Sequence, residues 1–435
     1  IAHGTAKGAL DSFNKYLAQE LGPYGITSNI VAPGLVETDA TKEAPEEFSS
    51  HLSMLFDVFP AEELSVIRPQ ADEQVAPVYG LYQDYCVDYF DENGVCDACS
   101  SAQQKWNGNK SINWEKRSQE FDDIINKLPK DRIYDCVVPV SGGKDSTYQT
   151  YRMCRHHGLK VLAVTFDQFD QTDFGRHNLD ILREIGVDHI HFTLNPNLVK
   201  ILVLRGFEEV GDPYWVNHVG IFSIPTRVAS WMKIPLVVYG ENPQFEYGGP
   251  PEARNPKPMN KRWRQEFGGL RGLREEDLID SQVSKRDVEI LRFPEEKELE
   301  GIRGVFYGDF FRWDPIAKTE FIKTLGWKSL AKPPYGSSSV DENCDMEFID
   351  IREHIKFLKF GYGRATDQLN IEIRAGKLKR ADGLKIVQNI DGAVSEENIQ
   401  KFCECDIYMI AIFDTNLSNA DTIYENSAKF YGIAP

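Results

Sequence analysis

The sequence contains no hydrophobic run of the roughly 20 apolar residues that a membrane-spanning helix requires. It also shows no signal peptide at Ile1. Cysteine is scarce, with 8 residues in a chain of 435, whereas small secreted proteins depend on dense disulfides. These absences predict a cytoplasmic protein in a reducing compartment, with no membrane partner.

Positive charge is in short supply as well. The 49 Lys and Arg residues are outnumbered by 67 Asp and Glu, which leaves a net charge of −18 at pH 7. An acidic chain is repelled by the phosphates of nucleic acids and by anionic membranes. We therefore do not expect nucleic acid as a partner. The length allows two or three domains and a large core.

The central motif lies at residues 135–153. The apolar run 135–140 predicts a short buried strand, and residues 146–153 predict a helix. Between them, Ser141-Gly142-Gly143 permits a sharp turn, because glycine adopts backbone conformations that other residues avoid. The N–H groups and the positive dipole end of such a helix bind anions. The motif therefore predicts a phosphate site at this turn.

The side chains of the motif favour a nucleotide. Lys144 adds a full positive charge, and Ser141 and Ser146 add hydroxyl donors. Asp145 would repel a phosphate unless a cation lay between them, which indicates Mg²⁺. The glycine spacing differs from that of the G-x-x-x-x-G-K-[ST] loop.

The S-G-G-x-D-S pattern instead resembles the PP-loop of ATP pyrophosphatases, which cleave ATP between its α and β phosphates. The resemblance implies that ATP binds Ser141, Gly142, Gly143, Lys144, Asp145 and Ser146. It also implies catalytic roles for Lys144 and Asp145, with Asp145 holding Mg²⁺. An ordinary glycine turn is the alternative interpretation.

Buried strands and helices alternate after the motif. Strands are expected at 160–167, 189–194 and 234–241, with helices at 177–185 and 197–210 between them. This order predicts an α/β fold, in which helices cover both faces of a parallel sheet. Asp167 and Glu241 end two strands at the edge where such sheets bind ligands, so we expect them near ATP or its metal. Helix capping is the alternative for Asp167.

A cysteine pair precedes the motif. Cys96 and Cys99 have the C-x-x-C spacing of a zinc knuckle and follow an Asn-Gly turn. Cys86 supplies a third zinc ligand at most, and Cys344 or a histidine could supply the fourth through space. A pair of free thiols on a loop is the alternative.

Three further residues are candidates for binding the substrate. Arg364 and Arg374 lie close to glycines, where guanidinium groups grip a phosphate or a sugar carboxylate. Structural ion pairs are the alternative for both. His218 lies in a polar and aromatic segment, and a structural histidine is its alternative.

Several segments together resemble the N-acetyl sugar amidotransferases of surface-polysaccharide and nonulosonic-acid pathways. They are residues 90–96, 139–146, 211–213, 218–222 and 361–367, within a similarity that covers about 85–430. The resemblance implies that ATP activates the acetamido oxygen of an N-acetylated sugar or sugar nucleotide, and that ammonia then displaces AMP to leave an acetamidino group. A separate glutamine amidotransferase subunit would supply the ammonia.

The chain departs from this family at two cysteine motifs. A second C-x-x-C ahead of the Asn-Gly turn is reduced to Cys86. Tyr214 and Asn217 stand where another C-x-x-C usually follows Gly-Asp-Pro. Both losses weaken the expectation of zinc.

The first 45 residues resemble the C-terminal part of a short-chain dehydrogenase. Lys7 matches the lysine of that family, but His3 occupies the place of its tyrosine, and the dinucleotide-binding turn is missing. We therefore interpret this head as a remnant or a fusion. The expected domains are the head (1–45), a linker (46–84), a cysteine-containing module with a lead-in helix (85–130), an ATP-binding α/β domain (131–250) and a mostly helical, substrate-binding region (251–435).

Two other functions compete with the sugar ligase. The first is a tRNA-modifying PP-loop enzyme, in which Cys96 or Cys99 would carry sulfur. The second is a non-catalytic partner protein whose nucleotide site only senses ATP. The acidic balance of the chain argues against the first.

Overall fold

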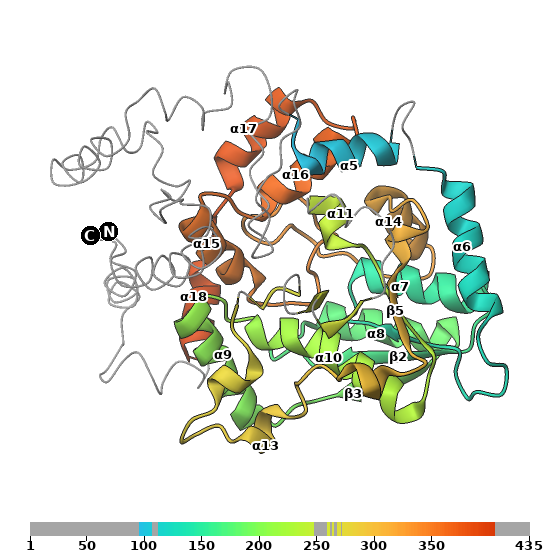
Figure 1. The fold of residues 1–435 in the computed structure, drawn as a ribbon. Helices are drawn as coiled ribbons and strands as arrows, with labels where there is room; N and C mark the ends of the chain where they lie inside the picture. Colours follow the sequence, from blue (N-terminus) through green and yellow to red (C-terminus); the bar gives the residue numbers. More distant parts are fainter. Residues whose placement is uncertain are drawn as a thin grey trace, which may run out of the picture.

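The computed structural model describes residues 95–106, 112–247, 259–261, 263–264, 268–270 and 272–404 (Figure 1). The strands are β1 Cys136–Pro139, β2 Val161–Phe166, β3 Asp188–Phe192, β4 Leu236–Tyr239 and β5 Arg303–Phe306. The helices before β5 are α5 Asp97–Trp106, α6 Trp114–Asn126, α7 Lys144–Tyr151, the π-helical turn η4 Arg152–His156, α8 Asp173–Ile185, α9 Pro196–Val210, α10 Trp215–Met232, α11 Pro243–Tyr247, η6 Glu275–Leu278, α13 Lys285–Val288 and η7 Glu296–Leu299. Those after it are η8 Tyr307–Asp309, α14 Pro315–Lys323, α15 Ile349–Phe360, α16 Arg364–Arg374, α17 Arg380–Ile390 and α18 Glu396–Glu404.

The five strands form one parallel sheet in the order β3-β2-β1-β4-β5. Successive residues of each strand point to opposite faces, and both faces are buried. Val137 and Val237 lie in the core of one face, whereas Val138 and Val238 lie in the core of the other. The predicted α/β fold with a parallel sheet is therefore confirmed.

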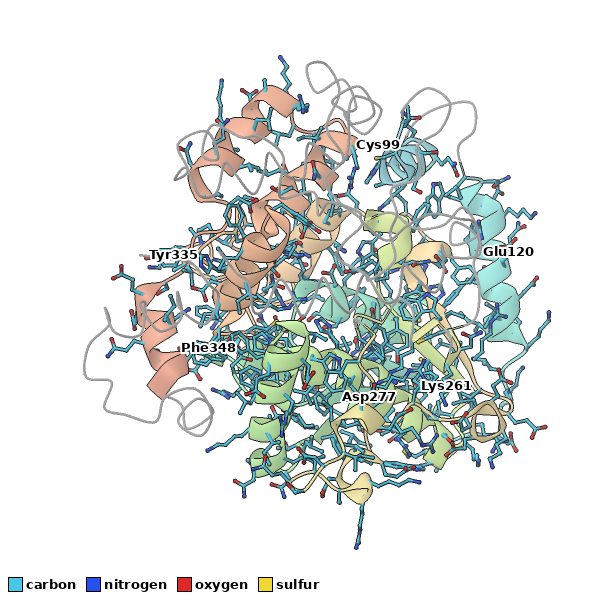
Figure 2. All side chains as sticks on the ribbon, turned by 60° about the vertical axis from the view of Figure 1, so that its left-hand side comes forward. Cys99, Glu120, Lys261, Asp277, Tyr335 and Phe348 are labelled. Carbon is cyan, nitrogen blue, oxygen red and sulfur yellow. The ribbon has the colours of Figure 1, made fainter. Side chains whose placement is uncertain are left out.

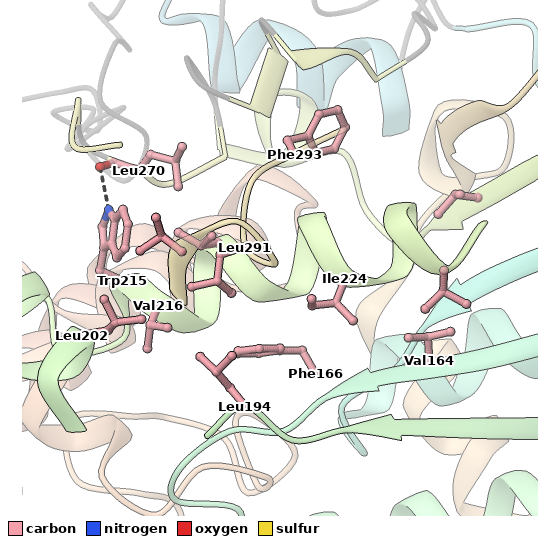
Figure 3. Close-up of a cluster of buried hydrophobic side chains, with 14 of the residues drawn as sticks. Val164, Phe166, Leu194, Leu202, Trp215, Val216, Ile224, Leu270, Leu291 and Phe293 are labelled. Atoms are coloured by element: carbon pink, nitrogen blue, oxygen red, sulfur yellow. Dashed lines mark hydrogen bonds between the residues drawn. The ribbon is translucent and has the colours of Figure 1, made fainter. Parts of the chain in front are cut away.

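Helices α9 and α10 cover one face of the sheet. Figure 3 shows α10 lying over β2, with Ile224 and Trp215 on the side that meets Phe166 and Leu202. Gly220 of α10 has no room for a side chain, because a Cβ there would collide with the Phe166 ring. The Trp215 indole N–H donates to the carbonyl oxygen of Leu270 at 3.0 Å, which satisfies a buried donor.

Helices α7, α8 and α14 cover the opposite face. Its core contains Phe121 of α6, Met153 after α7, Leu182 of α8 and Ile322 of α14. Both faces are thus closed by helices from different parts of the chain. Only the edges of the sheet remain for ligands, as expected for an α/β fold.

Helix α9 spans the predicted range 197–210 and continues through Gly206, where a Cβ would lie 2.6 Å from that of Trp215, so close packing explains this glycine. One feature of the sheet differs from the sequence-based expectations. Strand β5 was not expected, because Arg303-Gly304-Val305-Phe306 is short and half polar. It extends the sheet beyond residue 250, the predicted end of the ATP-binding domain.

The region after α14 is mostly helical, as predicted. Phe348 and Ile351 pack with Phe207 of α9, which attaches α15 to the sheet domain (Figure 2). Helix α5 lies against α16, although the two are far apart in the sequence (Figure 1).

Among the described residues, no helix combines the length and the apolar character that crossing a bilayer demands. The dehydrogenase-like head, the linker and Cys86 lie outside the described residues.

Candidate active site

The loop after β1 leads the chain into α7 at the carboxyl edge of the sheet. It lies between β1 and β4, where the strand order reverses and where open α/β sheets bind ligands. Gly143 is the N-cap of α7 and offers no side-chain cap to the first N–H groups of the helix. The Ser141 hydroxyl accepts from the Gly143 N–H at 3.3 Å, and the Ser146 hydroxyl donates to the Gly143 carbonyl at 3.2 Å. The resulting turn has the features of an anion site.

Gly142 fixes the shape of this turn. Its φ of +97° lies in the left-handed region, and a Cβ there would collide with the Gly175 carbonyl oxygen of α8. The Trp327 indole N–H donates to the Gly142 carbonyl at 3.1 Å. The turn is thus clamped between α8 and a residue that follows α14.

Two lysines hold the carboxylate of Asp145. The Lys144 Nζ lies 2.7 Å from Asp145 Oδ2, and Lys318 of α14 pairs with Oδ1. Burial disfavours the charged form of Asp145, but the two ammonium groups outweigh it and keep the pKa of this carboxyl below its usual range. Burial also opposes the charge of Lys144, but neighbouring carboxylates, foremost Asp145 and Glu342, raise its pKa well above the usual value. Asp145 and Lys144 are therefore both charged at neutral pH.

Glu241 follows β4 and faces the same lysines. Burial, and next the charge of Asp145, raises the pKa of Glu241 to about 7. Lys318 is itself buried, with its Nζ 3.5 Å from the centre of the Trp313 ring, and its charge lowers the pKa of Glu241. The structure thus brings Glu241 to the loop, while its contact with ribose or metal stays a prediction.

Asp167 has partners on the neighbouring strand. Its carboxylate accepts from the Thr193 hydroxyl at 3.0 Å and lies 3.2 Å from Nε2 of His191. Both partners come from β3 or the residues directly after it. Asp167 therefore lies at the expected edge, but it is engaged with β3 rather than with Lys144. Its predicted role toward ATP stays a prediction.

The C-terminal region reaches the loop through Glu342. This carboxylate lies 2.8 Å from Lys144 Nζ and 2.6 Å from the Arg364 guanidinium at the start of α16. Burial opposes its charge, but Lys144 and Arg364 outweigh burial and lower the pKa of Glu342. Arg364 therefore lies close to the predicted ATP site, through an ion pair.

The positive charge of Arg364 also acts on Asp367, and from Asp367 a line of buried ion pairs continues between α15, α16 and the start of α10. We call it the ion-pair chain, and it consists of Lys318, Asp145, Lys144, Glu342, Arg364, Asp367, Lys356, Glu353, Arg352 and Asp212. Its far end reaches His218, whose Nε2 is 3.1 Å from Arg352 and 3.6 Å from Asp212. Buried charges are costly to desolvate. A chain of buried charges therefore indicates a functional site rather than an arrangement that mainly stabilises the fold.

Arg374 does not join Arg364. The two residues are the last and the first of α16, and at a rise of ~1.5 Å per residue the helix separates them by ~15 Å. Arg374 instead lines a cavity of about 180 Å³ with Cys99, Gln103, Asn370 and Ile373. The two arginines therefore lie at different places, and the predicted role of each toward the substrate stays a prediction.

The predicted zinc ligands Cys96 and Cys99 lie near Arg374, and Cys99 lines the same cavity. Cys96 is buried, and the Cys99 N–H donates to its Sγ at 3.4 Å, at the start of α5 (Figure 2). Hydrogen bonding with Cys96, and then the charge of Arg374, lowers the pKa of Cys99 to about 6 although burial acts in the other direction. Within the described ranges no third His, Cys, Asp or Glu completes a metal site. The described residues thus supply two of four zinc ligands, and zinc stays a prediction.

The loop offers oxygen ligands that suit magnesium. Asp145 and Glu241 present carboxylates beside the anion site, and hard cations such as Mg²⁺ prefer oxygen. Protein sites usually give Mg²⁺ one or two carboxylates, and substrate phosphates supply the rest. Asp145 and Glu241 therefore fit this ion and are the residues that would hold it.

Sequence reasoning missed Lys318 and Glu342. One signal for Lys318 was available, because Asp314-Pro315 opens a helix after an aromatic segment and places this lysine one turn inside. Glu342 lies in an irregular segment without periodicity or motif. Only the folding of residues 337–345 onto the loop reveals its position.

Comparison with known families gives two separate matches. Residues 326–414 match the family described as LPS biosynthesis protein WbpG-like, C-terminal domain. This segment contains Trp327, Glu342 and Arg364, which connect it to the loop and to Lys144. Residues 2–66 match the family described as enoyl-(acyl carrier protein) reductase.

Curated relatives match the head of the chain. Over 44 residues it is 50% identical to the short-chain reductase protein NovJ of Streptomyces niveus and 48% identical to the 3-oxoacyl-[acyl-carrier-protein] reductase FabG of Pseudomonas aeruginosa. Each match covers 10% of this chain, but only 17% and 18% of the two reductases. The predicted similarity to a fragment of a short-chain dehydrogenase is confirmed, in residues outside the described ranges.

Two solved structures resemble the chain at a low level. NMN synthetase from Francisella tularensis has a TM-score of 0.29 and 12% identity, over 61% of this chain and 94% of that one. The U34-tRNA thiolase NcsA from Methanococcus maripaludis, solved with its [4Fe-4S] cluster, has a TM-score of 0.29 and 14% identity, over 73% and 91%. Because these TM-scores are low, the assignment of the fold depends on the observed sheet alone. Independently of these structures, residues 326–414 are similar to a WbpG-like LPS biosynthesis domain.

Proposed function

We propose that this chain is an ATP-dependent ligase of surface-polysaccharide biosynthesis, which converts the acetamido group of an N-acetylated sugar into an acetamidino group. The observation that carries the proposal is the site itself. The S-G-G-x-D-S turn, which contains Lys144, lies at the strand-order reversal together with Lys318 and Glu241. A segment similar to a WbpG-like LPS biosynthesis domain contacts this turn. No covalent nucleophile is required, because ammonia is already nucleophilic.

The reaction would proceed in two steps. In the first, the acetamido oxygen attacks the α-phosphorus of ATP, a C–O–P linkage forms and the α–β phosphoanhydride bond breaks, so that pyrophosphate leaves. In the second, ammonia attacks the activated carbon and loses a proton, the C–O bond breaks, and AMP departs with the former carbonyl oxygen. An amide carbonyl is a poor electrophile, and adenylation supplies the leaving group that the second step needs.

The residues of the loop have separate tasks in this scheme. The N–H groups at the start of α7 and the ammonium groups of Lys144 and Lys318 would bind the β and γ phosphates and stabilise the departing pyrophosphate. Asp145 and Glu241 would hold Mg²⁺, which supplies charge neutralisation between carboxylates and phosphates when it is bound. Holding ATP and the amide in line would provide the remaining acceleration.

The sugar would lie between the loop and His218. Arg364 belongs to the ion-pair chain, and His218 lies beside its far end. Both side chains can therefore contact a polar substrate that lies along the chain. Arg374 is too distant for the same ligand. A glutamine amidotransferase subunit is the proposed source of ammonia, and free ammonium would replace it in vitro.

Pyrophosphate release tests this proposal. Wild-type protein would be given ATP, Mg²⁺, ammonium and a panel of N-acetylated UDP- and CMP-sugars. We expect release that depends on one sugar class, and its loss in Asp145→Ala. Asp173→Ala serves as the matched control, since Asp173 is an exposed carboxylate on α8 paired with Arg176.

Three results would contradict the proposal. Pyrophosphate release without sugar or ammonia would indicate a different reaction. Binding of ATP without turnover on any sugar would favour the non-catalytic alternative, and tight, salt-sensitive binding of tRNA would favour the RNA-modifying one.

A further inference from the structure

Glu342 occupies an unusual position for a carboxylate. It bridges two cations, with Oε1 at 2.8 Å from Lys144 and Oε2 at 2.6 Å from Arg364. Its side chain is only 16% exposed, so the two contacts are largely shielded from water. The loop, however, has the N–H groups and the lysines of a site for external anions. The Glu342 carboxylate is thus paired with cations that lie at the proposed phosphate site.

The contacts of Glu342 resemble those of a phosphate. A carboxylate presents two oxygens to a lysine and an arginine, as a phosphate does when it bridges the same pair. Lys144 and Arg364 come from α7 and α16, so the bridge joins the nucleotide loop to the C-terminal region. Neither cation can give full hydrogen bonds to a phosphate while it is engaged with Glu342.

Glu342 is carried by an irregular segment, residues 337–345, which is tied at both ends. At one end, the Gln368 side chain accepts from the Ser338 N–H at 2.8 Å. At the other, the Thr172 hydroxyl donates to the Cys344 carbonyl, and the Thr172 N–H donates to the Asp345 carbonyl at 3.2 Å. Asn343, next to Glu342, has a φ of 50°, which is uncommon outside glycine. The segment is also held beside Glu342, where the Val340 carbonyl accepts from the Leu330 N–H at 3.0 Å and the Asp341 carboxylate accepts from the Ser329 hydroxyl. A turn of the Glu342 side chain on this held backbone would withdraw its carboxylate from the loop.

We propose that Glu342 is an internal competitor for the phosphate site, which ATP displaces from Lys144 and Arg364 when it binds. This inference rests on the proposed nucleotide function of the loop. Arg364 then becomes a phosphate ligand supplied by the C-terminal region. Because the Glu342 carboxylate links Lys144 to Arg364, its displacement couples binding of the nucleotide to the packing of α16, where the sugar is expected.

The opposite role for Glu342 predicts the opposite result. If the carboxylate served to position Lys144 and Arg364 for ATP, its neutralisation would weaken binding. If it competes with ATP, its neutralisation strengthens binding. The direction of the change in affinity therefore separates the two roles.

Calorimetric titration with α,β-methylene-ATP and Mg²⁺ tests the proposal, because this analogue binds without being cleaved. We expect Glu342→Gln to bind about tenfold more tightly than wild type, and Lys144→Ala to lose binding. Glu275→Gln is the matched control, since it also removes a buried carboxylate, from a pair with Arg264, and we expect wild-type affinity.

The outcomes distinguish this inference from the function on which it rests. If wild type binds the analogue while Glu342→Gln binds equally or less well, the competitor role is overturned and the nucleotide site stands. If no protein binds it, both are overturned. Hydrogen exchange on wild type gives a measurement that needs no variant: amides in 337–345 should exchange faster with the analogue bound, and unchanged or slower exchange there would overturn the inference.

Discussion

At the scale of the residue, the candidate site is defined by ammonium groups that converge on one carboxylate. Lys144 belongs to the motif itself, whereas Lys318 comes from α14 and reaches the other oxygen of Asp145. Burial lowers the pKa of Lys318, and the charge of Asp145 opposes this effect. A bound triphosphate would provide such a lysine with further negative charge, which favours its charged form.

Lys318→Ala should therefore weaken the binding of ATP. A charge-assisted hydrogen bond to phosphate contributes about 1.5–3 kcal/mol, so we expect the Kd to rise by about ten- to hundredfold. Titration with ATP and Mg²⁺ measures the change. Lys323→Ala is the matched control on the same helix, because Lys323 pairs with Glu320 and Asp341 and is one-third exposed. Equal effects of both variants would contradict a specific role of Lys318.

At the scale of the element, α14 positions Lys318 through its N-cap. The Asp314 carboxylate accepts from the N–H groups of Ile316 and Ala317, at 3.0 and 3.2 Å. Pro315 at the first helical position fits the same start, since it lacks the N–H that would need a partner. Lys318 lies in the first turn and a half, where fraying would move it most.

Removing this cap should weaken the binding of ATP without touching the loop. Asp314→Ala loses about 1 kcal/mol of helix stability, and we expect the affinity for ATP to fall by about threefold to tenfold. Asp314→Asn keeps a capping oxygen but loses the ion pair with Lys377, so its affinity should stay near that of wild type. If both variants lose affinity equally, the pair with Lys377 matters and the cap does not.

At the scale of the whole molecule, the ion-pair chain connects the sheet domain with α15 and α16. Lys356 is central to it, 3.2 Å from Glu353 and in direct contact with Asp367, and only 3% of its side chain is exposed. The ion-pair chain ends at Asp212, in the turn before α10, and beside His218 of α10. Movement of the C-terminal helices relative to the sheet would therefore separate buried charges, at a high cost in free energy.

Lys356→Met should destabilise the protein strongly. It leaves the carboxylates of Glu353 and Asp367 buried without their shared cation, which costs about 3–5 kcal/mol. The midpoint of urea unfolding measures this loss. Lys385→Met is the control, because the Lys385 side chain is 76% exposed, and it should change stability by less than about 0.5 kcal/mol. A shift for Lys356→Met as small as that of the control would show that the chain does not hold the two regions together.

Local sequence patterns were sufficient for the motif and for most of the sheet. β1, β2 and β4 are buried on both faces, so they appear in the sequence as continuous apolar runs. The Ser-Gly-Gly turn requires glycine at Gly142 for a backbone reason that acts within a few residues. β5 was missed, because a four-residue strand with Arg303 and Gly304 has no apolar run to identify it.

The sequence by itself thus determined the α/β fold, the Ser-Gly-Gly turn between strand and helix, and the similarity of the head to a short-chain dehydrogenase. Each of these depends on neighbouring residues and their periodicity. Only the tertiary structure decided which charges meet at the turn. Lys318 and Glu342 arrive from segments distant in the sequence, and Arg374 is held away from Arg364 by the length of α16. Electrostatic pairing depends on distance in space, which no local pattern encodes.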